Sequence, residues 1–321
     1  MDKQTAQQGF SSRSMWLIPF ACLLAGGALI GISTNLAKYA GEIGLTALAF
    51  LFWSIVGASI ILLIVAFIRR DLPPLNRRSF EYYFVTALVS VAGSNLLLFS
   101  AIPHVGAGFV ALIVSLPPLL TYLAALILRM EKFHILRALG VAAALIGAGV
   151  LAVHKLSAPD TSLFWILIAL CGPVLLAIGN IYRTLRWPKD ASPNALAPGM
   201  LVAAALLLLI FSILPNESVA VPPVEWLPIG VMIIQSCVFA GQFLLLFLLQ
   251  KTGGPVLLSL LGAVGAVVGV PVAIFLQGEA PPEGLFIGAS LIAVGVGLVT
   301  WGGVRMTTKQ SINVKTPEDK Q

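Results

Sequence analysis

Residues 92–99 read AGSNLLLF and residues 240–247 read AGQFLLLF, so six of eight positions are identical although the stretches start 148 residues apart. The leucines alone would be weak evidence in so apolar a chain. The same shift also pairs a glutamate and four further glycines: Gly106 with Gly254, Glu131 with Glu279, Gly140 with Gly288, Gly147 with Gly295 and Gly149 with Gly297. No gap is needed between residues 92 and 149, which indicates an internal duplication.

A second shift, of 145 residues, extends the duplication upstream. It pairs Asn35 with Asn180 and Lys38 with Arg183, each an amide followed three residues later by a cation. The two halves therefore carry the same polar pair near one end of their first helix.

The composition places this duplication in a membrane. Hydrophobic residues make up 59% of the 321 residues and charged residues 10%, and the mean hydropathy is +0.99. A soluble domain has about 25% charged residues, and a membrane-spanning helix needs about 20 apolar residues. We predict an all-α polytopic membrane protein whose ten transmembrane helices cover residues 16–38, 44–68, 79–101, 107–129, 136–154, 162–184, 196–214, 227–250, 255–277 and 284–304.

The basic residues predict the orientation. With the N-terminus in the cytoplasm, cytoplasmic segments hold 17 of the 19 Lys and Arg residues, and only Lys38 and Lys155 fall outside. This bias follows the positive-inside rule. We predict a multi-pass protein of the bacterial inner (plasma) membrane with both termini cytoplasmic. The net charge of +6 is then a topology signal, and no nucleic-acid partner is expected.

Ten helices divide into two halves of five, and an odd number inverts the second half. The predicted organisation is a cytoplasmic tail (1–15), a first five-helix repeat (16–154), a periplasmic connector (155–161), a second five-helix repeat (162–304) and a cytoplasmic C-terminal tail (305–321). Inverted repeats are a hallmark of secondary transporters, because halves of opposite orientation make inward-open and outward-open states near mirror images.

Two longer stretches carry a family resemblance. PPLLTYLAALILRMEKFHILRALGVAAALIGAGVLAV (117–153) and GVPVAIFLQGEAPPEGLFIGASLIAVGVGLV (269–299) each place a proline in a helix, a glutamate at its end and then a glycine-spaced helix. This pattern resembles the drug/metabolite transporter superfamily, specifically its EamA-type ten-helix members. The resemblance implies a transporter of small metabolites, and exporters of amino acids are among the family's members.

The first candidate substrate-binding residues are Asn35, Lys38, Asn180 and Arg183. They would place a cation and an amide near each mouth of a pathway, which suits a carboxylate. The alternative for the cations is a structural one, in which each interacts with a helix C-terminus while its stem reaches the interface.

Further polar candidates lie on the repeated helices themselves. Ser94 and Asn95 lie on the third helix, together with Ser90, and Gln235 and Gln242 share one face of the eighth. Polar groups inside a membrane usually face the bundle interior or a water-filled cavity. The alternative is hydrogen bonding that only joins helices.

The fourth predicted helix contains a candidate site for an interruption of the helix. Ser115, Thr121 and Tyr122 flank the pair Pro117-Pro118. Two prolines leave backbone carbonyls without their helical donors, and irregular backbone within a membrane belongs where it lines a cavity. The alternative is helix bending for packing alone.

Glycines at 140, 147 and 149 and at 288, 295 and 297 form small-residue faces on the fifth and tenth helices. Such faces allow close helix packing, and a homodimer contact stays open as their second interpretation. Glu131 and Glu279 are expected at interfacial helix ends in structural roles.

We predict a secondary transporter that moves a small organic metabolite by alternating access, with export of an amino-acid-like compound as the leading interpretation. A polytopic membrane enzyme and a non-transporting sensor or assembly partner are the alternatives. The chain has no GxxxxGK[ST], HExxH or GxSxG motif, and its three cysteines lack metal spacing. No metal, cofactor or enzymatic activity is therefore expected, and the partners are a small metabolite and the lipid bilayer.

Overall fold

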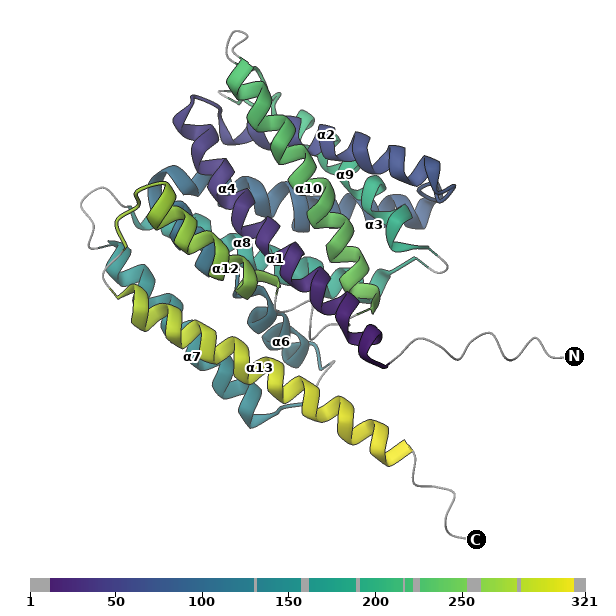
Figure 1. The fold of residues 1–321 in the computed structure, drawn as a ribbon, viewed down its shortest axis with the longest axis vertical. Helices are drawn as coiled ribbons and strands as arrows, with labels where there is room; N and C mark the ends of the chain where they lie inside the picture. The colour runs from purple at the N-terminus through teal and green to yellow at the C-terminus, as the bar shows by residue number, and fades with distance from the viewer. Residues whose placement is uncertain are drawn as a thin grey trace, which may run out of the picture.

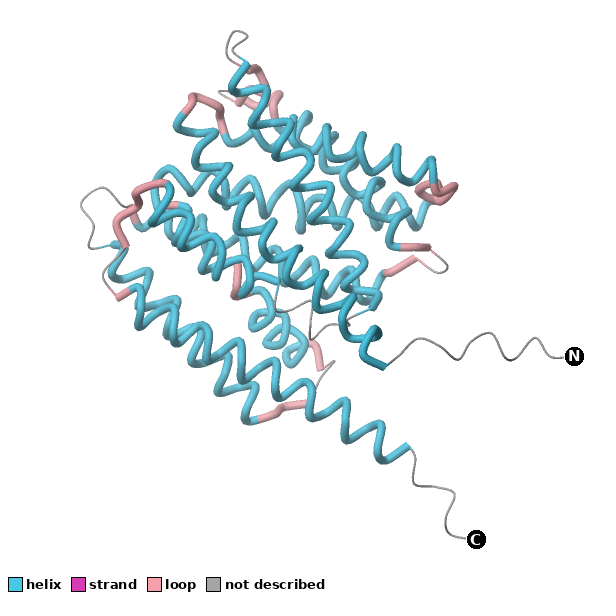
Figure 2. Tube along the Cα trace, viewed as in Figure 1, coloured by secondary structure: helices cyan, strands magenta, loops and turns pink. Residues whose placement is uncertain are grey.

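The computed structural model describes residues 12–129, 132–156, 162–188, 191–215, 217–221, 226–252, 261–281 and 284–314, and within them it is all helical, without strands. Figure 2 shows that short loops join these helices. The prediction of an all-helical membrane fold is confirmed, as expected where backbone amides find no water and must pair within their own segment.

The first half begins with two long helices, and later segments are interrupted (Figure 1). Its elements are α1 (Ser12–Glu42), α2 (Ala47–Ile68), α3 (Arg77–Ala87), the π-helical turn η1 (Leu88–Ala92), α4 (Gly93–Val105), α5 (Ala107–Ile113), α6 (Pro117–Ile127) and α7 (Ile135–Leu156).

The second half repeats this order with fewer interruptions among its described residues. Its elements are α8 (Leu163–Arg186), α9 (Pro193–Phe211), α10 (Trp226–Thr252), α12 (Leu261–Pro271), the π-helical turn η2 (Val272–Leu276) and α13 (Leu285–Val314).

Within the described residues each predicted span overlaps a helical segment, but the boundaries differ, and residues 255–260 of the ninth predicted span lie outside the described part. The first helix starts at Ser12 instead of residue 16, and the last runs to Val314 instead of residue 304. Eight described helices are long and apolar enough to cross a membrane, and two shorter apolar helices cover Leu261–Leu276 and Leu285–Val299. Ten crossings and the inverted relation of the halves stay predictions.

Short polar side chains begin several helices. Thr46, Asn76 and Ser192 accept hydrogen bonds from the backbone N–H groups of the residues three positions later, at 3.1, 2.8 and 3.1 Å. These are N-caps, which satisfy helix donors that have no partner within the helix. The caps explain why α2, α3 and α9 start where they do.

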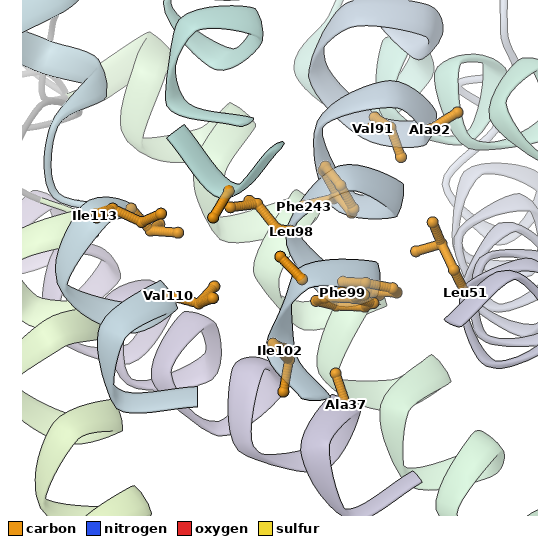
Figure 3. Packing of buried hydrophobic residues seen from close by; sticks show 14 of the residues in the cluster. Ala37, Leu51, Val91, Ala92, Leu98, Phe99, Ile102, Val110, Ile113 and Phe243 are labelled. Carbon is orange, nitrogen blue, oxygen red and sulfur yellow. The ribbon is translucent and has the colours of Figure 1, made fainter. Parts of the chain in front are cut away.

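Helix α4 lies at the centre of the packed core. Figure 3 shows its residues Leu98, Phe99 and Ile102 among apolar side chains from α1, α2, α5 and α10. Phe99 stacks on Phe239 of α10 with ring centroids 6.2 Å apart, and it also contacts Phe50 of α2 at 5.8 Å. The repeated stretch 92–99 is therefore the helix around which both halves pack.

Helices α7 and α13 run side by side along one edge of the bundle (Figure 1). A Cβ atom on Gly140 would lie 2.7 Å from the Gly295 carbonyl oxygen, and one on Gly147 would lie 2.7 Å from that of Gly288. Four of the six predicted glycines thus pack closely between the two helices of one chain, whereas a Cβ atom on Gly149 or Gly297 would meet nothing within 4 Å. The residues 315–321 and Glu131 lie outside the described part of the protein.

Candidate functional site

A cavity of about 110 Å³ lies where six segments meet: α1, η1 with α4, the junction of α5 and α6, α8, α10 and α12. A buried space needs only about 10–15 Å³ by this measure to hold one water molecule, so this cavity has room for a small solute. Its polar lining residues are Ser33, Thr34, Ser90, Asn95, Asn180, Arg183 and Gln242.

The break between α5 and α6 shapes one wall of the cavity. Pro118 has no N–H to donate to the Val114 carbonyl, four residues earlier, and the helix stops at Ile113 and restarts at Pro117. A Cβ atom on Gly262 of α12 would collide with the Val114 carbonyl oxygen. The predicted proline break therefore lines the cavity, which is where irregular backbone is tolerated at membrane depth.

A π-helical turn carries Ser90 to the cavity. η1 inserts between α3 and α4, and the Gly93 N–H bonds to the Leu88 carbonyl, five residues back. Such turns often occur at functional sites. Gly179 of α8 faces Ser90 so closely that a Cβ atom there would collide with the hydroxyl. The Ser90 hydroxyl oxygen is buried and has no hydrogen-bond partner among the described residues.

One buried cation faces the cavity. The Arg183 side chain is 2% exposed, and its Nη2 donates to the Asn180 Oδ1 at 2.5 Å. Its Nε makes no hydrogen bond within the described part of the chain. The i, i+3 spacing that the sequence repeats thus joins Asn180 and Arg183 directly.

The structure brings four of the predicted site residues into this cavity: Asn95, Asn180, Arg183 and Gln242. The sequence interpretation missed Ser33 and Thr34, which lie beside them on α1. Gln235, although predicted, lies behind the lining. It is fully buried, and its Nε2 donates to the Ser33 hydroxyl at 2.5 Å.

Asn35 joins two helices instead of lining the cavity. Its Nδ2 donates to the Gly31 carbonyl at 2.8 Å and to the Gly269 carbonyl of α12 at 3.0 Å. A Cβ atom on Gly31 would lie 2.7 Å from the Gly269 nitrogen, so α1 and α12 cross in close contact. Asn35 is part of this crossing.

Four other residues predicted for the site do not line the cavity, and they lie among packed side chains and backbone. Ser94 is fully buried, and Ser115 donates to the Leu112 carbonyl at the α5–α6 break. The Tyr122 hydroxyl accepts from the His134 N–H at 3.1 Å, and the guanidinium of Arg137 lies 3.9 Å from its ring centre. The Thr121 hydroxyl is buried without a partner among the described residues.

Lys38 lies outside the cavity, at one end of the bundle. Its Nζ lies 3.0 Å from the Glu279 Oε1 and 3.9 Å from the Glu42 carboxylate. Glu279 also accepts hydrogen bonds from the backbone N–H groups of Ala107 and Gly108 at the start of α5, at 2.7 and 3.0 Å. One carboxylate therefore ties α1, α5 and the end of η2 together.

A second hollow of about 460 Å³ lies at this end, lined by Lys38, Glu42, His104 and Glu279 among others. Among the described residues no group of three or more His, Cys, Asp or Glu side chains could hold a metal ion.

The order of residues along each helix places the two sites relative to each other. On α1 the cavity residues Ser33 and Thr34 precede Lys38, and the cavity residue Gly262 of α12 precedes Glu279, which follows η2. Along α5 the order is reversed. Ala107, its first residue, binds Glu279 of the ion pair, and Val114, directly after its last residue, lines the cavity. All three elements put the cavity on one side and the ion pair at the opposite end of the bundle.

An apolar helical bundle with a cavity between its helices and an ion pair across one end is the architecture of a multi-pass membrane protein. Residues 17–153 match the family model of the EamA-like transporter family. The predicted resemblance is confirmed over these residues, which are similar to that family, a part of the drug/metabolite transporter superfamily. This similarity favours a membrane transporter of small molecules.

The solved structures show the same fold over nearly the whole chain. A crystal structure superimposes on 92% of this chain and 99% of its own, with a TM-score of 0.57 and 21% sequence identity. In all, 28 solved chains are similar to this one. No curated protein matches it.

Proposed function

We propose that this protein is a secondary transporter that moves a small organic metabolite through the central cavity by alternating access. The observation that carries the proposal is the cavity itself. Both halves of the chain build it, and they supply it with an amide each, Asn95 and Gln242, beside the pair Asn180 and Arg183.

The helix contacts support a two-fold relation between the halves. Helix α1 packs on α10 and α12, while α8 packs on α4 and α6, which are the corresponding helices of the other half. Likewise α2 packs on α10, and α9 packs on α3. Each contact thus has a counterpart with the roles of the halves exchanged, as a two-fold relation requires.

The crossing of α7 and α13 also fits a two-fold relation between the halves. Gly140 meets Gly295 and Gly147 meets Gly288, whereas the sequence repeat pairs Gly140 with Gly288 and Gly147 with Gly295. Equivalent positions therefore meet crosswise, which is how two copies of one helix pack about a two-fold axis. Such symmetry lets the two access states have similar energies.

The ion pair supports a closed end. Lys38 and Glu279 bind across α1, η2 and α5 at the end of the bundle away from the cavity. Under the predicted orientation this end is periplasmic, so the cavity belongs to the cytoplasmic half and the conformation faces inward. Release to the periplasm then requires Glu279 to leave Lys38 and the α5 amides.

The lining suits a solute with both polar and apolar parts. Donors from Arg183 and hydroxyls from Ser33 and Thr34 lie beside the rings of Phe99 and Phe243. An amino-acid-like compound offers a charged end and an apolar body to such a site. We propose export of a compound of this kind across the inner membrane.

Purified protein in sealed liposomes loaded with a metabolite mixture tests this function. Exchange of external labelled amino acids or related acids for the internal pool, above that of empty liposomes, is the expected result. The absence of exchange or net flux with every metabolite pool would contradict transport. The Glu279→Gln variant provides a matched protein in which closure of one end is impaired.

A further inference from the structure

The Arg183 guanidinium is a buried cation with an unpartnered N–H donor among the described residues. It lines the cavity from the last turn of α8, where its Nη2 donates to the neutral amide of Asn180 and its Nε has no hydrogen-bond partner among the described residues. An arginine side chain is always charged and offers five N–H donors in a planar fork that fits a carboxylate.

No carboxylate oxygen of the described residues lies within 4.0 Å of Arg183. Lys38, its counterpart in the sequence repeat, has the opposite situation, because Glu279 lies 3.0 Å away and Glu42 lies 3.9 Å away. Charged side chains inside a membrane are costly, and they usually mark a substrate or ion pathway. The contrast points to a counter-charge for Arg183 that enters with a ligand.

Other polar atoms of the cavity also lack partners in the described structure. The hydroxyl oxygen of Ser90 and the Oε1 of Gln242 are both buried and without a hydrogen bond. Ser90, on η1, faces Gly179 of α8, and Gly179 lies one turn before Arg183 on that helix. A carboxylate bound at Arg183 would find a further donor in the Ser90 hydroxyl, whereas the Gln242 Oε1 is an acceptor and suits a donor group elsewhere on the ligand.

The remaining lining is apolar and partly aromatic. Leu98, Phe99 and Phe243, which Figure 3 labels, all line the cavity. Aromatic rings prefer offset or edge contacts with other apolar rings. This wall fits the body of a ligand whose charged end lies at Arg183.

We propose that the cavity binds its substrate as a carboxylate: the Arg183 guanidinium takes the carboxylate group, Asn180 orients the guanidinium, and Phe99 and Phe243 contact an apolar body. This proposal rests on the proposed function and names its substrate class, an organic acid with one negative charge at the site. The single buried cation of Arg183 balances one negative charge on the ligand. A neutral amide with the same shape as the acid should therefore bind poorly.

Two probes of equal shape test the proposal: phenylacetate and phenylacetamide. Thermal unfolding of the purified full-length protein, followed by tryptophan fluorescence, reports their binding. We expect phenylacetate to stabilise the protein with an apparent affinity about ten-fold or more above that of phenylacetamide, because charge-assisted hydrogen bonds are the stronger ones. Equal shifts, or no shift with either probe, would overturn the proposal.

Arg183→Met removes the charge and keeps the length of an apolar side chain. We expect it to abolish the difference between the two probes and to raise the unfolding temperature without ligand, because the buried charge without a counter-charge is gone. Arg186→Met is the matched control, since Arg186 is exposed one turn further along α8. It should keep the difference between the probes. A purely structural Arg183 would instead give a lower unfolding temperature in Arg183→Met.

Asn180→Asp is a second variant that keeps the guanidinium. A carboxylate at residue 180 would pair with Arg183 and compete with phenylacetate. We therefore expect the affinity for phenylacetate to fall about ten-fold or more and the unfolding temperature without ligand to rise. Unchanged phenylacetate binding would contradict the assigned role of Arg183.

Glu131→Gln tests for a counter-charge from within the chain, since the repeat pairs Glu131 with Glu279 in sequence. A loss of stability in Glu131→Gln that Arg183→Met reverses in the double variant would identify such a pair and overturn the proposal. An unchanged unfolding temperature supports it.

Failure of this inference and failure of the transport function give different results. Exchange of neutral or cationic solutes in liposomes, without phenylacetate binding, would refute only the carboxylate assignment. Phenylacetate binding that depends on Arg183, without exchange of any solute, would refute transport and keep the site.

Discussion

The Nζ of Lys38 lies 3.0 Å from the carboxylate of Glu279, and the two side chains are 18% and 16% exposed. Glu279 also accepts hydrogen bonds from two backbone N–H groups at the start of α5. This single carboxylate therefore pairs with the Lys38 cation and satisfies helix donors that have no partner within α5. The relationship joins a residue that follows η2, in the second half of the chain, to the C-terminal end of α1 and the start of α5 in the first half.

Glu279→Gln should therefore destabilise the protein. The amide keeps at most one acceptor for α5 and leaves Lys38 without its nearer counter-charge. Breaking a fully buried pair costs about 3–5 kcal/mol, and a cost of about 2 kcal/mol is expected for this partly exposed one. Thermal unfolding in detergent measures it.

Two variants serve as controls for that measurement. Glu42→Gln removes the more distant carboxylate, 53% exposed and 3.9 Å from Lys38, and should change stability by less than about 1 kcal/mol. The double variant Lys38→Met with Glu279→Gln should recover part of the loss, since no charge is then left unpaired. Additive losses in the double variant would show that the two side chains do not act as a pair.

Asn35 and Gln242 should respond differently to truncation, although both were predicted as site residues. Asn35→Ala removes the hydrogen bond between α1 and α12 and should lower stability by about 1 kcal/mol with little effect on substrate affinity. Gln242→Ala removes a cavity-lining amide and should weaken affinity with little loss of stability. Apparent affinity for the exchanged metabolite, measured beside thermal unfolding, separates the two effects. The same response in both variants would contradict these assignments.

The sequence predicted the helices well because a bilayer leaves the backbone few alternatives. It predicted the cavity only in part, because the lining depends on how each helix is rotated. Ser94 and Asn95 are neighbours in sequence, but only Asn95 lines the cavity. Thr34 gave no signal, since its hydroxyl also bonds to the Gly31 carbonyl within its own helix, as Thr does in many helices.

The tyrosine at residue 122 shows a second limit of the sequence. Its neighbourhood of prolines and hydroxyls is typical of a binding site, yet its hydroxyl is taken by the backbone of His134 and its ring by Arg137. Both partners lie beyond the end of α6, on the other side of a turn. No periodicity along a single helix could have revealed that contact.

The α7–α13 crossing offers a test with two glycines only two residues apart. A Cβ atom on Gly147 would lie 2.7 Å from the Gly288 carbonyl oxygen and 3.0 Å from the Ile292 nitrogen, whereas one on Gly149 would meet nothing within 4 Å. Gly147→Ala should cost about 1–3 kcal/mol because the backbone of α13 has to move. Gly149→Ala should be neutral or stabilising by up to about 1 kcal/mol. Equal effects of the two variants on thermal unfolding would contradict the close crossing within one chain and favour a contact between chains.

Thr34 offers a test of which side the cavity opens to. In a cysteine-free background, Thr34→Cys should react with a membrane-impermeant maleimide added from the cytoplasmic side, because Thr34 lines the cavity and a thiol needs water to become a reactive thiolate. Ile32→Cys is the matched control, since Ile32 is exposed on the apolar outside of α1 and would face lipid. It should react slowly from either side.

Adding Glu279→Gln to Thr34→Cys connects the cavity to the ion pair. If the pair of Lys38 and Glu279 closes the periplasmic end, its loss shifts the population toward the outward-facing state, and labelling of residue 34 from the periplasmic side should rise several-fold. Everted and right-side-out vesicles separate the two sides. Labelling that stays confined to the cytoplasmic side in the double variant would show that Glu279 stabilises the bundle without controlling access, and labelling mainly from the periplasmic side in both proteins would reverse the proposed orientation.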